Sequence, residues 1–177
     1  MKQNLIIYST TDGHTEAICR YIKSLLQKDF NTTLISIHKL DKLNLSHFDM
    51  IIIGASIRYG KHKPELYQFI KENINILNNV KTAFFSVNAV ARNLEKNKPE
   101  TNPYIKKFLE TSIWKPLHVA VFAGKINYPK YKLLDKLMIK LIMWLTNGPT
   151  NTSQEYEFTN WDDINQFCKR LRKTELC

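Results

Sequence analysis

The sequence predicts an α/β fold, a single domain over residues 1–177 that is built on a five-stranded parallel sheet with helices on both faces. Apolar runs rich in β-branched residues alternate along the chain with helical patterns, which is the order of βαβ units. The run at 48–54, FDMIIIG, is apolar without alternation, as expected of a strand buried on both faces of a parallel sheet. The length of 177 residues fits one domain.

The individual elements follow from the same patterns. We expect strands at 5–8, 31–37, 48–54, 82–87 and 117–123, and helices at 13–28, from 64, at about 104–111 and after 160. Pro64 suits a first helical turn, and Asn160 is a good N-cap. Five strands in a chain of this length fit the doubly wound order 2-1-3-4-5. In that order ligands bind at the carboxyl ends of the strands, beside the first strand.

A long insertion, about residues 124–159, separates the last strand from the last helix, where a plain connection would be far shorter. Its residues 131–145 read YKLLDKLMIKLIMWL, with leucines on one face and lysines along another. This pattern predicts a basic amphipathic helix that docks on a membrane surface or a partner, and packing on its own sheet is the alternative. The expected membrane or quinone contacts are Lys132, Lys136, Lys140, Leu141, Met143 and Trp144.

Composition narrows the class of protein. AT-rich codon usage is one explanation for the formal net charge of +10, and binding to a negatively charged partner is the other. No recognised motif supports nucleic-acid binding. No apolar stretch is long enough to cross a bilayer. Cys19, Cys168 and Cys177 are far apart, without C-x-x-C or zinc spacing, so we expect free thiols in a reducing cytoplasm and no metal.

The turn after the first strand, STTDGHT at 9–15, is the strongest candidate ligand site. Its hydroxyls and backbone N–H groups would converge at the positive end of the following helix, and Gly13 permits close approach of an anion. The turn has neither a Walker lysine nor G-x-G-x-x-G, so it suits a terminal monophosphate such as that of FMN, with an ordinary capped turn as the alternative. The candidate ligands are Ser9, Thr10, Thr11, Asp12, Gly13, His14 and Thr15.

Four motifs give the chain a resemblance to a known family. They are STTDGHT at 9–15, IGASIRYG at 53–60, FFSVN at 84–88 with VAR at 90–92 behind it, and the block from YPKY to MIKLIM at 128–143. Over nearly its full length the chain resembles flavodoxin-like proteins and, more narrowly, the menaquinone-dependent protoporphyrinogen oxidases of gamma-proteobacteria. The last motif is characteristic of those oxidases rather than of flavodoxins in general.

The resemblance implies non-covalent FMN and the oxidation of protoporphyrinogen IX to protoporphyrin IX in haem biosynthesis. Six electrons would pass to a respiratory quinone, menaquinone or ubiquinone. The protein would lie peripherally on the cytoplasmic side of the bacterial inner membrane. Two segments would border the flavin ring: Ala55, Ser56, Ile57, Arg58, Tyr59 and Gly60 in a loop after the third strand, and Ser86, Val87, Asn88 and Ala89 after the fourth.

The resemblance leaves most of the chemistry to N5 of the flavin, so no side chain is assigned as catalytic. Arg58 is the one expected to assist, near N1 and O2 of the ring, with propionate binding or a place in solvent as alternatives. Tyr59 would stack on the ring or cover the core. His14 would supply an N–H rather than a charge, and we expect Asp12 to point away from the phosphate and cap the helix.

Alternatives remain for the role of the basic segment 92–107 and for the function of the protein. Arg92 and the lysines of 92–107 would attract propionates or form a solvated surface. A generic FMN-dependent quinone reductase would need a nicotinamide site, which the sequence does not show. A flavodoxin-type electron carrier is typically acidic, which the net charge of +10 argues against.

Overall fold

The computed structural model describes residues 1–40 and 43–176. The strands are β1 (Gln3–Ser9), β2 (Asn31–Ser36), β3 (Met50–Arg58), β4 (Lys61–His62), β5 (Lys81–Asn88), β6 (His118–Ala123), β7 (Lys125–Asn127) and β8 (Glu155–Glu157). The α-helices are α1 (His14–Leu26), α2 (Pro64–Leu77), α3 (Pro103–Thr111), α4 (Leu133–Leu145) and α5 (Trp161–Leu176). Short 3₁₀ turns are η1 (Ile37–Lys39), η2 (Leu45–His47), η3 (Ala89–Arg92), η4 (Leu94–Lys96) and η5 (Tyr128–Lys130).

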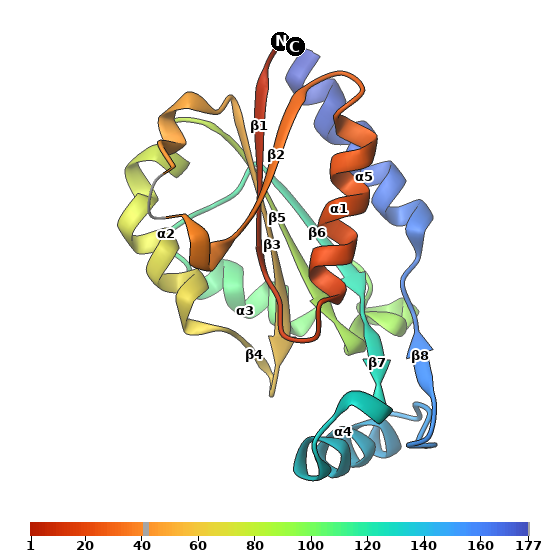
Figure 1. Ribbon diagram of the computed structural model, residues 1–177. Helices are drawn as coiled ribbons and strands as arrows, with labels where there is room; N and C mark the ends of the chain where they lie inside the picture. Colours follow the sequence, from red (N-terminus) through yellow and green to blue (C-terminus); the bar gives the residue numbers. More distant parts are fainter. Residues whose placement is uncertain (41–42, 177) are drawn as a thin grey trace.

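Five parallel strands form the main sheet in the order β2-β1-β3-β5-β6 (Figure 1). This arrangement confirms the predicted doubly wound order. Three short strands were not predicted: β4 pairs antiparallel with the end of β3, and β7 and β8 form a separate two-stranded ribbon. Strands of two or three residues are too short to show a periodicity in the sequence.

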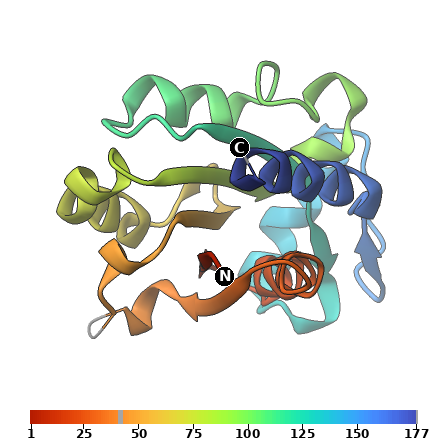
Figure 2. The same ribbon diagram turned by 90° about the horizontal axis from the view of Figure 1, so that it is seen from above.

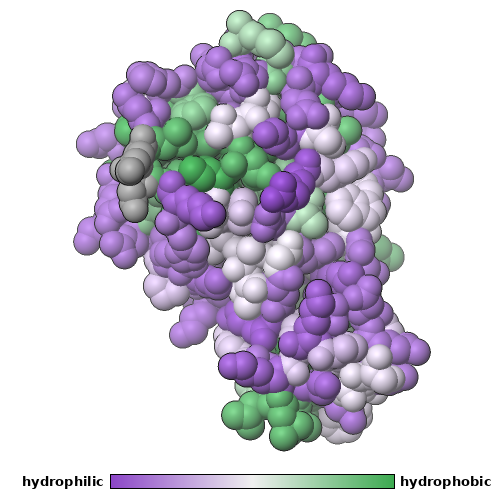
Figure 3. Space-filling view, viewed as in Figure 1, coloured by the Kyte–Doolittle hydropathy of each residue, from purple (hydrophilic) through white to green (hydrophobic). Residues whose placement is uncertain are grey.

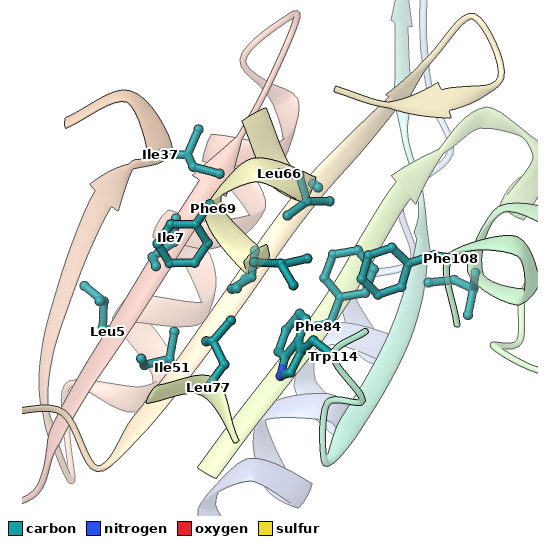
Figure 4. Packing of buried hydrophobic residues seen from close by; sticks show 14 of the residues in the cluster. Leu5, Ile7, Ile37, Ile51, Leu66, Phe69, Leu77, Phe84, Phe108 and Trp114 are labelled. Carbon is teal, nitrogen blue, oxygen red and sulfur yellow. The ribbon is translucent and has the colours of Figure 1, made fainter. Parts of the chain in front are cut away.

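Helices cover both faces of the sheet (Figures 1 and 2). On one face α2 and α3 bury a cluster in which the rings of Phe84 and Phe108 stack with centroids 4.2 Å apart (Figure 4). On the other face α1 and α5 pack together against residues such as Phe85. Residues 50–53 of β3 have no exposed surface, which confirms that this apolar run is a strand buried on both faces.

The insertion lies beyond the carboxyl ends of the strands (Figure 1). The β7–β8 ribbon leads to α4, which begins two residues later than the predicted helix at 131–145. A small third cluster, formed by Ile126, Tyr128, Tyr131 and Met143, joins the ribbon to the helix. Within residues 1–40 and 43–176, no helix is long and apolar enough to cross a membrane.

Two of the three cysteines belong to the core. Cys19 in α1 and Cys168 in α5 are buried free thiols in the cluster between these helices and the sheet. Burial raises the pKa of both thiols, to about 12 for Cys168, so neither is activated as a nucleophile. Cys177 lies outside the described residues.

His62 gives the core a pH dependence. Its side chain is 3% exposed and lies 3.0 Å from Ser86 Oγ, beside the rings of Phe84 and Phe108. Burial lowers its pKa from 6.5 to about 4, so the unfolded chain binds this proton more readily than the folded protein. We expect the free energy of unfolding to decrease as the pH falls from about 6.5 to about 4, by at most about 3 kcal/mol.

Urea unfolding of wild type and His62→Gln at a series of pH values measures this effect. The variant should show a flatter dependence on pH in that window because glutamine does not titrate. Identical dependence in the two proteins would contradict the assignment.

Candidate functional site

The carboxyl ends of β1, β3 and β5 surround a pocket that α4 covers. Its wall includes thirteen of the seventeen residues that the sequence predicted for cofactor binding. They are Thr10, Thr11, Asp12, His14, Thr15, Ser56, Ile57, Arg58, Tyr59, Gly60, Val87, Asn88 and Ala89. The edge of the sheet therefore brings three separate sequence motifs to one place, as expected where parallel strands end together.

Three predicted residues have side chains that lie in the core instead of the pocket. Ser9 is buried and its hydroxyl donates to Glu65 Oε1 at 3.2 Å. Ala55 and Ser86 have no exposed surface, and the Ser86 hydroxyl is hydrogen-bonded to His62. Because side chains alternate along a strand, these three side chains point away from the pocket, and contact of these residues with a ligand stays a prediction.

The sequence missed part of the wall. The additional residues are Val90, Tyr104, Gly124, Lys125, Ile126, Tyr131, Ile139, Ile142 and Met143. A signal existed for residues 124–126, which follow β6 and so must lie at the same edge of the sheet. No pattern in the sequence indicated that α4 folds back over this edge.

The turn at residues 9–15, called here the anion loop, is held by one internal hydrogen bond and by a contact from Lys63. The Gly13 N–H donates to Thr10 Oγ1 at 3.1 Å, and Gly13 is the N-cap of α1 with a φ of 84°. No side chain caps α1, so its first N–H groups face the pocket side without a side-chain partner. Lys63 donates to the Thr10 carbonyl at 2.8 Å and brings to the loop a positive charge that its own sequence lacks.

Asp12 does not cap α1, which corrects the expectation from the sequence. Its carboxylate forms an ion pair with Arg58 instead, with Nη1 and Oδ2 3.0 Å apart. The pair turns the acid away from the first N–H groups of the helix and neutralises its charge. The anion loop therefore presents no unpaired negative charge that would repel a phosphate.

Arg58 joins three segments of the chain. Its Nη1 contacts Asp12, and its Nη2 lies 3.0 Å from Oδ2 of Asp135 in α4. The guanidinium also lies over the rings of Tyr59 and Tyr131, at 5.2 and 5.1 Å from their centroids. Burial acts to lower the pKa of Arg58, but Asp12, Tyr59 and Asp135 raise it above its ordinary value, so the side chain stays charged.

This pairing excludes one of the alternatives for Arg58, which is a place free in solvent. The side chain is 17% exposed, so it does not lie free in solvent. Both ends of its fork are held by carboxylates, so a substrate propionate would have to displace one of them.

The segment 55–60 is a hairpin rather than the predicted loop. β3 continues to Arg58, and Ile57 pairs with His62 across the chain. Tyr59 and Gly60, with φ of 49° and 79°, form the two-residue turn, whose backbone needs positive φ at both positions. The turn places the Tyr59 ring at the edge of the pocket, where it is half exposed and its hydroxyl donates to Asp135.

His14 links the anion loop to the end of the insertion. Its Nε2 lies 2.6 Å from Thr159 Oγ1, and the Thr159 hydroxyl donates to the Ala123 carbonyl at 3.0 Å. Since the one hydroxyl proton is used there, Nε2 must be the donor to Thr159. Burial lowers the pKa of His14, which favours the neutral ring, so this N–H supports the loop without adding charge.

Arg92 does not belong to a solvated surface. Its Nη2 donates at 2.7 Å to both the carbonyl and the hydroxyl of Thr146, the C-cap of α4. Its Nη1 donates to the Ala89 carbonyl at 2.9 Å. The interpretation of Arg92 as a propionate anchor or a free surface charge is therefore replaced by a structural role between η3 and α4.

Met143 does not belong to the exposed face of α4 that the sequence predicted for membrane contact. It is fully buried and lines the pocket, whereas Lys132, Lys140, Leu141 and Trp144 are exposed and Lys136 is partly buried. Gly148 allows this packing, because an added Cβ would lie 2.3 Å from Cε of Met143.

Among the described residues that line the pocket, Ser56 carries the one buried side-chain atom without a hydrogen-bond partner. This atom is the hydroxyl oxygen, Oγ. A buried hydroxyl without a partner costs about 1–3 kcal/mol, so the structure favours a polar group bound beside it.

Comparisons with known proteins agree with this geometry. A flavodoxin domain family matches residues 5–153. The protoporphyrinogen IX dehydrogenase [quinone] of Escherichia coli K12 is 39% identical over 170 residues, which cover 96% of this chain and 94% of that protein. The protein of the same name from Leishmania major is 38% identical over 165 residues, 92% of this chain and 71% of that one.

A solved structure shares the fold. A flavoprotein from Lactobacillus acidophilus, crystallised in complex with FMN, aligns with a TM-score of 0.51 and 17% identity. The alignment covers 68% of this chain and 93% of that one. At this identity the likeness concerns the fold alone.

Proposed function

The chain belongs to the flavodoxin domain family and, within it, to the protoporphyrinogen IX dehydrogenases, and from this membership we propose that it oxidises protoporphyrinogen IX and passes the electrons to a quinone. It is an oxidoreductase of porphyrin and haem biosynthesis. The observation that carries this conclusion is the 39% identity over 96% of the chain, which includes the insertion.

The cofactor that fits the pocket is FMN. The anion loop offers backbone N–H groups and the side chains of Thr10, Thr11 and Thr15 to a terminal phosphate, with Lys63 as a nearby cation. The unpartnered Ser56 hydroxyl supplies a polar contact for a ring edge. When bound, the flavin supplies the redox chemistry between the porphyrinogen and the quinone.

The remaining work of the protein is binding and positioning. Apolar side chains on both sides of the pocket, among them Ile57, Val87 and Ile142, suit a flat ring and exclude water from it. Arg58 keeps its positive charge beside the pocket through its two carboxylate partners. Catalysis would depend mainly on holding the flavin and the substrate in a fixed relative orientation.

The direct test is an anaerobic assay of the purified protein. We expect yellow protein that retains FMN and that, with protoporphyrinogen IX and a menaquinone analogue, produces fluorescent porphyrin over many turnovers. Omitting the quinone should limit the porphyrin formed to at most about one third of an equivalent per bound flavin, because a flavin accepts two of the six electrons. Flavin-loaded protein that forms no more porphyrin than a protein-free control would refute the proposed reaction.

Ser56→Ala separates the ligand role of the hydroxyl from a structural one. The ligand-free variant should be as stable as wild type, or more stable by about 1 kcal/mol, because an unpartnered buried hydroxyl is removed. Its dissociation constant for FMN should increase by about fivefold to tenfold, because a hydrogen bond to the ligand is lost.

Urea unfolding and flavin-fluorescence titration measure the two effects of this change. Ser24→Ala, on the exposed surface of α1, is the matched control. Unchanged FMN affinity in Ser56→Ala would exclude the contact.

The outer face of α4 favours a peripheral position at the membrane. Its large apolar side chains are exposed, with Leu134 78% and Trp144 67% accessible, and a hydrophobic patch is seen at this end of the molecule in Figure 3. Lys132 and Lys140 flank this face and would attract anionic lipids. The proposed site of action is therefore the cytoplasmic side of the bacterial inner membrane, where the quinone is dissolved.

Vesicle flotation tests this proposal. Wild type should bind vesicles that contain phosphatidylglycerol, less tightly at high salt, because screening weakens the lysine contribution. Leu137→Ser/Leu141→Ser should reduce binding at least tenfold, because each leucine loses about 1.5–3 kcal/mol of apolar burial. Leu117→Ser, an exposed leucine just before the amino end of β6, is the control. Equal loss in the control, or no binding by wild type, would refute membrane docking through α4.

A further inference from the structure

We propose that α4 is a lid that closes over the cofactor pocket and retains the flavin, latched by Arg58 at its first turn and by Arg92 at its last. The identity of the ligand as a flavin rests on the proposed function. The latch itself rests on contacts within the chain and is tested without any ligand.

The latch at the first turn of α4 converges on one carboxylate. Asp135 receives Nη2 of Arg58 at 3.0 Å and the hydroxyl of Tyr59. The hydrogen bond from Tyr59 and the charge of Arg58 lower the pKa of Asp135, so it remains ionised and paired at neutral pH. The same guanidinium pairs with Asp12, so the lid and the anion loop are both held by Arg58.

The latch at the last turn uses the free carbonyl end of the helix. Arg92 donates to the carbonyl and the hydroxyl of Thr146, where the positive charge also complements the helix dipole. Between the two latches, Ile139, Ile142 and Met143 line the pocket. The inner side of α4 therefore forms a wall of the ligand site.

Little else holds α4 in place. Met143 is its one buried residue, and the helix is carried by a ribbon of two three-residue strands. The Arg58–Asp135 pair is partly exposed, with side-chain accessibilities of 17% and 30%, and exposed pairs of this kind are weak. An element with few buried contacts opens at low cost, so α4 can open while the sheet stays folded.

The consequence concerns entry and exit of the flavin. A ligand between the sheet edge and Ile139, Ile142 and Met143 is partly covered by α4, so movement of the helix widens its path out of the pocket. Weakening either latch should therefore speed both the opening of the insertion and the release of the cofactor. A fixed helix would predict no change in these rates.

Two variants weaken the latches separately: Asp135→Asn removes the charge partner of Arg58, and Thr146→Val removes one acceptor of Arg92. Asp163→Asn, an exposed carboxylate on α5, is the matched control. The first measurement is trypsin cleavage of the ligand-free full chain, followed by mass spectrometry at Lys130, Lys132, Lys136 and Lys140. The second is the release rate of FMN after dilution, followed by the fluorescence of free flavin.

We expect each latch variant to raise both rates by about twofold to fivefold, the range for loss of a partly exposed pair, and the control to match wild type. Far-UV circular dichroism and the urea midpoint confirm that the sheet is intact. Wild-type cleavage rates in both latch variants would overturn the latch, and faster cleavage with unchanged FMN release would overturn its retaining role. If wild type binds no FMN, the proposed function fails, and cleavage alone decides the latch.

Discussion

The charge of Arg58 is the constraint on which the site depends. A guanidinium that is largely removed from water must be paired, and its two carboxylates come from the anion loop and from α4. Neither Asp12 nor Asp135 is close to Arg58 in sequence. When α4 is closed, the pairing therefore sets the distance between the sheet edge and the insertion, and because the pairs are only partly buried, the helix can still open.

The two sides of α4 have different environments. Toward the sheet, the helix contributes Met143 to a small cluster with Tyr128 and Tyr131. Away from the sheet, leucines and Trp144 remain in contact with water. Contiguous exposed apolar surface of this kind is unfavourable in water and marks a surface that meets a membrane or another protein. One helix thus forms a wall of the pocket on one side and an exposed apolar face, the proposed docking face, on the other.

The anion loop stabilises negative charge mainly through geometry. Gly13 adopts the left-handed conformation that starts α1 without a side-chain cap, which leaves helix N–H groups for the ligand. Of the two cations near the loop, Arg58 is paired with Asp12, whereas Lys63 donates to the Thr10 carbonyl and leaves its charge beside the loop. The dipoles of fixed N–H groups lose no rotamer freedom on binding, which suits the proposed binding of a flavin phosphate.

The sequence by itself determined the five-stranded doubly wound sheet, the helices on its two faces, and the edge where ligands bind, because apolar periodicity is a local property and alternating strands and helices favour this arrangement. It also placed most of one pocket wall, from Thr10 to Thr15 and from Ser56 to Gly60. Only the tertiary structure decided that Asp12 pairs with Arg58, that Met143 faces inward, and that Arg92 holds the end of α4. The two arginine contacts join residues 46 and 54 positions apart, and the closure of the insertion over the sheet, which no local pattern encodes, brings these partners together.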